Sequence, residues 1–144
     1  MPVKHKGVEI VFDAEPLIAY LEDEPGSERV EEYLNKMKTG DLIAGISPVQ
    51  ITEVCYVAER LGSREVAIDF FRSLDEDGLK TTSVKNISIP AAEFKSMGHS
   101  LGDSFALATA YEEMATLIVG ADSDFDMDTT KLPLDIERMR DQAV

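Results

Sequence analysis

The stretch VEIVF at Val8–Phe12, followed at once by Asp13, decides how this chain folds. A short, nearly continuous apolar run is typical of a strand that is buried on both faces, as strands of a parallel sheet are. Helical patterns separate such runs, which predicts a parallel sheet whose two faces are covered by helices. Four later segments are predicted to be strands of the same sheet, at residues 42–46, 79–84, 116–120 and 132–136. The last is expected at an edge, because Pro133 has no backbone N–H to donate.

Six helices are predicted between these strands, at residues 16–22, 27–40, 48–61, 63–77, 89–97 and 103–115. Hydroxyl side chains at Ser27, Ser47 and Ser63 are typical of helix N-caps, and Pro48 suits the first turn after Ser47. In the helix after Ser63, the spacing predicts burial of Val66, Ala67, Phe70, Phe71 and Leu74. The fold class is therefore α/β: one domain over residues 1–144, in three α/β/α layers, with a central, mostly parallel sheet of four to five strands.

Composition narrows the classes of function. The chain has 28 Asp and Glu against 14 Lys and Arg, a formal net charge of −14, which argues against DNA binding through a lysine-covered surface. Its single cysteine, Cys55, excludes an internal disulfide and a CxxC redox motif. No apolar run approaches the roughly 20 residues that span a bilayer, and the N-terminus lacks the apolar core of a signal peptide. A cytoplasmic protein with no membrane contact is expected.

The excess of acidic residues is spread along the whole chain, in clusters at 22–24, 31–32, 75–77 and 112–113. An acidic tail would instead gather them at one end. Solubility alone would explain some excess of charge. A whole-surface distribution favours a protein adapted to a high-salt cytoplasm, where salt screens the repulsion between carboxylates. We therefore expect a halophilic protein.

Candidate functional residues follow from the fold class, because open parallel sheets bind ligands at the carboxyl ends of their strands. Right-handed crossovers bring the starts of the helices to the same edge. The polar residues expected there are Asp13, Ser47, Glu53, Asp103, Asp122 and Asp124.

Carboxylates that gather at one edge repel one another unless a cation compensates. Hard divalent cations prefer oxygen ligands, and Mg²⁺ or Mn²⁺ suits such a set best. The arrangement is typical of phosphodiester hydrolysis, with Asp13 and Asp103 holding the principal cation and Glu53 and Asp122 holding a second or orienting water. An acidic protein can then hold RNA through the cation, and the absence of a groove-reading element favours single-stranded or looped RNA.

Each carboxylate also has an ordinary structural explanation. Asp13 could cap a helix, Glu53 could be a solvated helix residue, and Asp122 and Asp124 could be loop acids. Asp103 could simply favour the helix dipole, worth roughly 0.3–1 kcal/mol. The functional hypothesis depends on their common location.

Four segments, taken in order, resemble the successive motifs of PIN domains, and most of all those of the small VapC-type toxins of prokaryotic toxin–antitoxin pairs. They are VFDA at 11–14, ISPVQITEV at 46–54, LGDSFALATA at 101–110 and LIVGADSDF at 117–125. The resemblance covers nearly the whole chain. It implies an endoribonuclease that depends on Mg²⁺ or Mn²⁺ and has an α/β/α fold.

The resemblance also assigns residues by position. Asp13 matches the first metal-binding aspartate, Glu53 the helix glutamate and Asp103 the third acid. Asp122 matches an acid that usually lies two residues after a threonine, whose place is taken here by Gly120. This departure weakens the assignment of Asp122 as a metal ligand and makes Asp124, the next acidic residue along the chain, an alternative ligand.

The resemblance also has implications for Asp124, for Ser47 and for the protein partners. Asp124 would support or replace Asp122, and Ser47 matches a small hydroxyl residue that orients the active-site network. The resemblance further implies a homodimer and a cognate antitoxin whose peptide fills a groove over the site.

Two other functions stay open at this stage. A catalytically degenerate PIN-like binding module is compatible with the missing threonine at position 120. A haloacid-dehalogenase-like phosphatase also begins with an aspartate after a buried strand, but that chemistry wants a second aspartate where Glu15 stands, and a suitably placed lysine is lacking.

Overall fold

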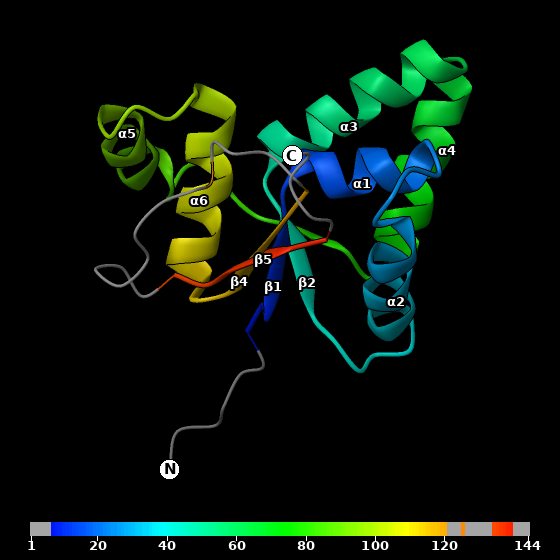
Figure 1. Cartoon of the computed structure of the whole chain (residues 1–144), viewed down its shortest axis with the longest axis horizontal. Helices are drawn as coiled ribbons and strands as arrows, with labels where there is room; N and C mark the ends of the chain where they lie inside the picture. The colour runs from blue at the N-terminus through cyan, green and yellow to red at the C-terminus, as the bar shows by residue number, and fades with distance from the viewer. Residues whose placement is uncertain (1–6, 121–124, 126–133, 140–144) are drawn as a thin grey trace.

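The described part of the chain forms one five-stranded sheet flanked by helices (Figure 1). The structure is a computed structural model that describes residues 7–120, 125 and 134–139. Every strand pairs in parallel with its neighbours, and the strand order is β3-β2-β1-β4-β5. The strands are β1 (Ile10–Phe12), β2 (Ala44–Ile46), β3 (Lys80–Thr81), β4 (Thr116–Val119) and β5 (Ile136–Arg138).

Strand β1 occupies the centre of the sheet and pairs with both β2 and β4. In the register of the sheet, Val11 lies beside Gly45 on one side, and Phe12 lies beside Ile118 on the other. The strand order reverses at β1, which makes the carboxyl end of this strand the place where a doubly wound sheet binds ligands.

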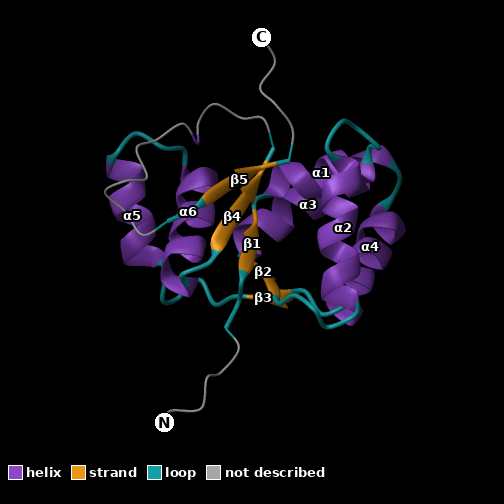
Figure 2. Cartoon of the chain, turned by 60° about the horizontal axis from the view of Figure 1, so that its bottom comes forward, coloured by secondary structure: helices purple, strands orange, loops and turns teal. Residues whose placement is uncertain are grey.

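Helices cover both faces of the sheet, as Figures 1 and 2 show. Helices α1 to α4 lie on one side and helices α5 and α6 on the other, which confirms the predicted α/β/α class. The helices are α1 (Ala14–Leu21), α2 (Ser27–Lys38), α3 (Pro48–Leu61), α4 (Arg64–Glu76), α5 (Ser88–Ser96) and α6 (Leu101–Glu113). None of the described helices is long and apolar enough to cross a membrane.

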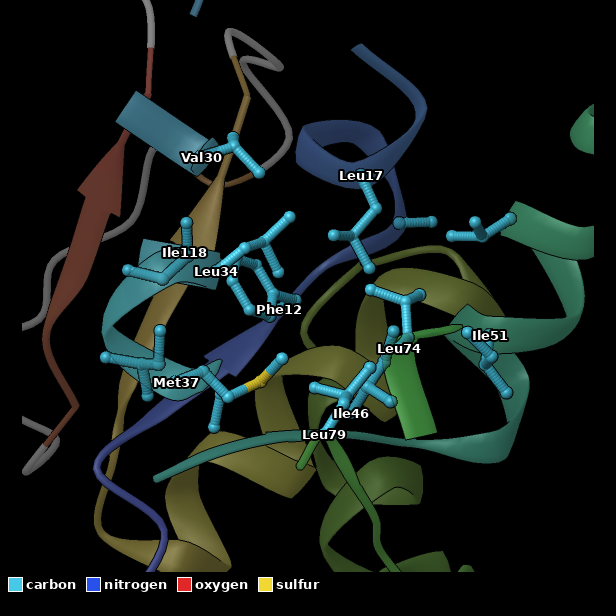
Figure 3. Packing of buried hydrophobic residues seen from close by; sticks show 14 of the residues in the cluster. Phe12, Leu17, Val30, Leu34, Met37, Ile46, Ile51, Leu74, Leu79 and Ile118 are labelled. Atoms are coloured by element: carbon cyan, nitrogen blue, oxygen red, sulfur yellow. The ribbon is translucent and has the colours of Figure 1, made fainter. Parts of the chain in front are cut away.

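The two helical layers bury separate hydrophobic clusters, and the strands contribute alternate residues to each. Phe12 and Ile118 point into the cluster under α1 to α4, where they meet residues such as Leu17 and Leu34 (Figure 3). Val11 belongs to the opposite cluster, under α5 and α6. Successive side chains of a strand point to opposite faces, so a short apolar strand supplies both cores.

Helix starts agree with the sequence prediction at two of the three predicted caps. The Ser47 hydroxyl accepts hydrogen bonds from the backbone N–H groups of residues 49 and 50, and the Ser63 hydroxyl accepts one from Val66. Ser27 was wrongly predicted as a cap. The N-cap of α2 is Gly26, whose φ of 98° is a conformation that glycine adopts easily.

The prediction that Val66 and Phe71 are buried is wrong. They are 44% and 39% exposed, although Ala67 and Leu74 of the same helix are buried. Helices α3 and α4 pack as a pair that leaves an open, largely apolar groove of about 590 Å³ between them. We call it the α3–α4 groove, and its lining residues are Ile51, Thr52, Cys55, Glu59, Arg64, Ala67, Ile68 and Phe71.

Candidate metal-binding site

Two junctions between a strand and a helix bring polar residues to the carboxyl edge of the sheet. A single residue, Asp13, connects β1 to α1, and a single residue, Ser47, connects β2 to α3. Because β1 and β2 are neighbouring parallel strands, these N-cap residues lie at the same edge. The backbone N–H of Asp13 donates to the carbonyl of Ile118 at 2.9 Å, which ties the first junction to β4.

Asp13 is a buried carboxylate, only 7% exposed. It occupies the N-cap position of α1, yet its side chain makes no capping hydrogen bond. Burial raises the pKa of Asp13 to about 7, with smaller upward contributions from the negative charges of Asp103, Glu53 and Glu15. The hydrogen bond from the N–H of Ala14 lowers the pKa in part. The carboxylate therefore sits in an environment that disfavours its own charge.

Glu53 and Asp103 approach the same place from two helices that pack against each other, α3 and α6. A glycine in α6 makes the approach possible, because a Cβ atom on Gly102 would lie 2.7 Å from Oε1 of Glu53. Burial raises the pKa of Glu53, and the charge of Asp103 raises it further. The structure thus brings together three of the predicted residues: Asp13, Glu53 and Asp103.

A chain of hydrogen bonds holds the starts of α3 and α6 together. The fully buried Ser47 hydroxyl donates to Oε1 of Gln50 at 2.5 Å, and Nε2 of Gln50 donates to the carbonyl of Gly102 at 2.6 Å. The hydroxyl of Ser100 caps α6 by accepting a hydrogen bond from the N–H of Asp103. The helices that carry Glu53 and Asp103 are therefore fixed relative to each other at the site.

Sequence reasoning missed Gln50, which is only 1% exposed. A signal for it exists, since Ser47 and Gln50 have the spacing of a capping box. The structure uses the amide differently, for the bridge to Gly102 rather than for the N-cap backbone.

Sequence reasoning also missed the position of Glu15, which lies in the first turn of α1. Its carboxylate occupies the space that a Cβ atom on Gly120 would need. Local sequence patterns do not predict this contact, because 105 positions separate the two residues.

The remaining candidates, Asp122 and Asp124, lie outside the described residues. Within the described ranges, no three His, Cys, Asp or Glu side chains are grouped closely enough to hold a metal ion. The donors nevertheless suit one, because Mg²⁺ is commonly bound by one or two carboxylates with water completing its shell. The buried charge of Asp13 and its repulsion by neighbouring acids are what a divalent cation would relieve.

The fold and the site together define an α/β/α domain with an acidic centre at the switch point of a parallel sheet. The family model of the PIN domain matches residues 10–127, and the chain belongs to the PIN domain family. This confirms the family resemblance seen in the four sequence segments.

One solved structure with the same fold is the DNA-bound VapBC complex from Salmonella typhimurium. The match has a TM-score of 0.66 and 14% sequence identity, and it covers 92% of this chain and 99% of the other. A comparison with curated proteins finds no match.

Proposed function

We propose that the protein is a divalent-metal-dependent endoribonuclease and the toxin of a toxin–antitoxin pair. Membership of the PIN domain family supports nuclease activity. The likeness in fold to a chain of a VapBC complex supports the VapC-type assignment. The single observation that carries the proposal is the convergence of Glu53 and Asp103 on the buried Asp13 at the end of the central strand.

Mg²⁺ or Mn²⁺ is the proposed cofactor. Asp13 and Asp103 would hold the principal ion, and Glu53 and Asp122 would bind a second ion or orient the attacking water, with Asp124 in support. The chemistry that such an ion supplies is polarisation of the scissile phosphodiester and activation of water. Cleavage leaves a 5′-phosphate and a 3′-hydroxyl.

The side chains around the ions have supporting roles in this proposal. The Ser47 hydroxyl, through Gln50, keeps the helix of Glu53 in register with the helix of Asp103. The acids place negative charge where a substrate phosphate must approach, so RNA binding should depend on the cations. Single-stranded or looped RNA is the proposed substrate.

The α3–α4 groove supports the antitoxin part of the proposal. It exposes apolar side chains such as Phe71 on an otherwise highly charged protein, which is typical of a surface that binds another protein. It shares helix α3 with the site, since Thr52 lines the groove and Glu53 is the next residue of that helix. A peptide of the antitoxin is its proposed occupant, and a homodimer of the toxin is the proposed assembly.

The decisive experiment is cleavage of a single-stranded RNA by the purified full chain in the presence of Mn²⁺ or Mg²⁺. Asp13→Asn and Asp103→Asn should each reduce cleavage at least about 100-fold, and EDTA should stop it. Asp69→Asn, the same change on an exposed position of α4, is the matched control and should cleave like the wild type. Cleavage that survives EDTA or Asp13→Asn would overturn the proposal.

The same variants separate the alternatives. A degenerate PIN-like module would bind RNA or a partner without cleaving, and wild type and Asp13→Asn would then behave alike. A phosphatase would hydrolyse small phosphate esters and leave RNA intact. For the toxin assignment, induced expression should arrest growth of a bacterial host, and co-expression of a neighbouring antitoxin gene should relieve the arrest.

A further inference from the structure

The backbone conformation at Gly120 does not require a glycine. Its φ is not among the positive values at which glycine is favoured, whereas those of Gly26, Gly40, Gly78 and Gly98 are. What a side chain would meet there is the carboxyl group of Glu15. An added Cβ atom would collide with Cδ and with both carboxylate oxygens of Glu15, which are the three atoms nearest to it.

The position of this contact places Glu15 at the edge of the acidic site. Gly120 is buried directly after β4, the strand that pairs with β1, and Glu15 lies two residues after Asp13. The Glu15 carboxylate therefore lies over the end of β4, close enough to Asp13 for its charge to act on that group.

The same arrangement occurs at a second place near Asp13. There Gly102 leaves room for the carboxylate of Glu53, as Gly120 leaves room for that of Glu15. In each case a glycine on one element admits a glutamate from a neighbouring helix to the same acidic site. The two contacts share no element, because one joins α6 to α3 and the other joins the end of β4 to α1.

We propose that Glu15 is an additional cation-binding carboxylate of this site, and that Gly120 is a glycine because Glu15 must enter there. The inference rests on the proposed function, since it assumes a divalent cation at Asp13. It reinterprets the departure from the PIN motif at position 120. The residue expected there is threonine, whose side chain would displace Glu15, so the glycine exchanges a hydroxyl for a carboxylate.

Direct titration of the full chain with MnCl₂, followed by calorimetry and by the rise in melting temperature, tests the inference without any activity measurement. Glu15→Gln should weaken Mn²⁺ binding by roughly 10-fold. Glu65→Gln, the same change in the first turn of α4 on an exposed residue, is the matched control and should bind Mn²⁺ like the wild type.

Gly120→Ala offers a second variant that leaves Glu15 in the sequence. The atoms it displaces are the far end of a flexible side chain, so we expect the variant to fold, as circular dichroism will verify. It should weaken Mn²⁺ binding as Glu15→Gln does, and the double variant should be no weaker than either single one. Independent, additive effects would show that Gly120 does not act through Glu15 and would overturn that part of the inference.

Asp13→Asn separates failure of this inference from failure of the proposed function. If the wild type binds Mn²⁺, Asp13→Asn does not, and Glu15→Gln binds as the wild type does, the role of Glu15 is refuted and the metal site stands. A lower melting temperature for Glu15→Gln with an unchanged response to Mn²⁺ refutes it too, because it shows a purely structural role. If the wild type binds no Mn²⁺, both proposals fall.

Discussion

The junctions after β1 and β2 have the same backbone form, but their N-cap side chains differ in hydrogen bonding and in charge. Each consists of one buried N-cap residue between a strand and a helix, at the same edge of the sheet. At the second junction Ser47 accepts two backbone N–H groups and donates to Gln50, so its hydroxyl is fully used. At the first, the Asp13 side chain makes no capping bond, and burial, with smaller contributions from the neighbouring carboxylates, raises its pKa.

The difference contrasts a junction that stabilises the fold with one that weakens it. Ser47 contributes to stability because each of its hydrogen bonds is made within the protein. Asp13 costs stability while no cation is bound, because a buried carboxylate without a compensating charge is unfavourable. Residues that weaken the folded state in this way mark functional sites more often than structural ones.

The largest expected effect is the change in stability when the charge of Asp13 is removed. The folded-state pKa of Asp13 is about 7, above its ordinary 3.8, so the folded protein binds the extra proton between these values. Stability from this group is therefore present at low pH and lost as pH rises towards 7. In EDTA, Asp13→Asn should be more stable than the wild type by up to about 4 kcal/mol above pH 7, and the gap should close at low pH.

Urea unfolding at both pH values measures that gap. A wild type more stable than Asp13→Asn in EDTA above neutral pH would contradict the picture of an uncompensated buried charge. Adding Mn²⁺ should reverse the order of the two proteins, because only the wild type gains binding energy.

A smaller effect is expected on the Ser47 side. Ser47→Ala removes an N-cap and leaves the buried Gln50 without its hydroxyl donor, which should cost about 1–2 kcal/mol at any pH. Ser63→Ala is a matched control, because it removes a cap that has no such buried partner. The Ser47 variant should lose more free energy of unfolding than the Ser63 variant. Equal losses would mean that the bridge through Gln50 adds nothing.

The smallest effect concerns salt. If the acidic surface reflects a high-salt cytoplasm, the stability of the wild type should rise as KCl increases from about 0.1 M into the molar range. The gap between Asp13→Asn and the wild type should change little, because buried charges are screened less than exposed ones. Thermal unfolding across the series measures both quantities, and a flat wild-type response would remove the halophile interpretation.

The sequence was informative where local chemistry and topology act together. Ser47 and Ser63 were recognisable as caps, and strand alternation was enough to place Asp13, Glu53 and Asp103 at one edge. The start of α6 lies two residues earlier than predicted. Ser100 caps it, and a glycine in the first turn hid the pattern.

Sequence patterns did not predict the contacts between segments that lie far apart along the chain. Helical spacing marks Val66 and Phe71 as apolar, but it cannot tell whether a neighbouring helix covers them, and here the α3–α4 groove stays open. The contact of Glu15 with Gly120 likewise depends on the register of β1 against β4. The spacing of apolar residues along one helix or strand carries no information about contacts of this kind.

The central position of β1 also governs when, during synthesis, the acidic site can form. The first strand leaves the ribosome early, but its partner β4 and the helix that carries Asp103 are among the last elements made. Domains generally fold as units during synthesis, so the late elements must be made before the sheet is complete. A nascent chain therefore lacks the complete acidic site until the segment up to the end of β4 has been made, so the site forms only late in synthesis.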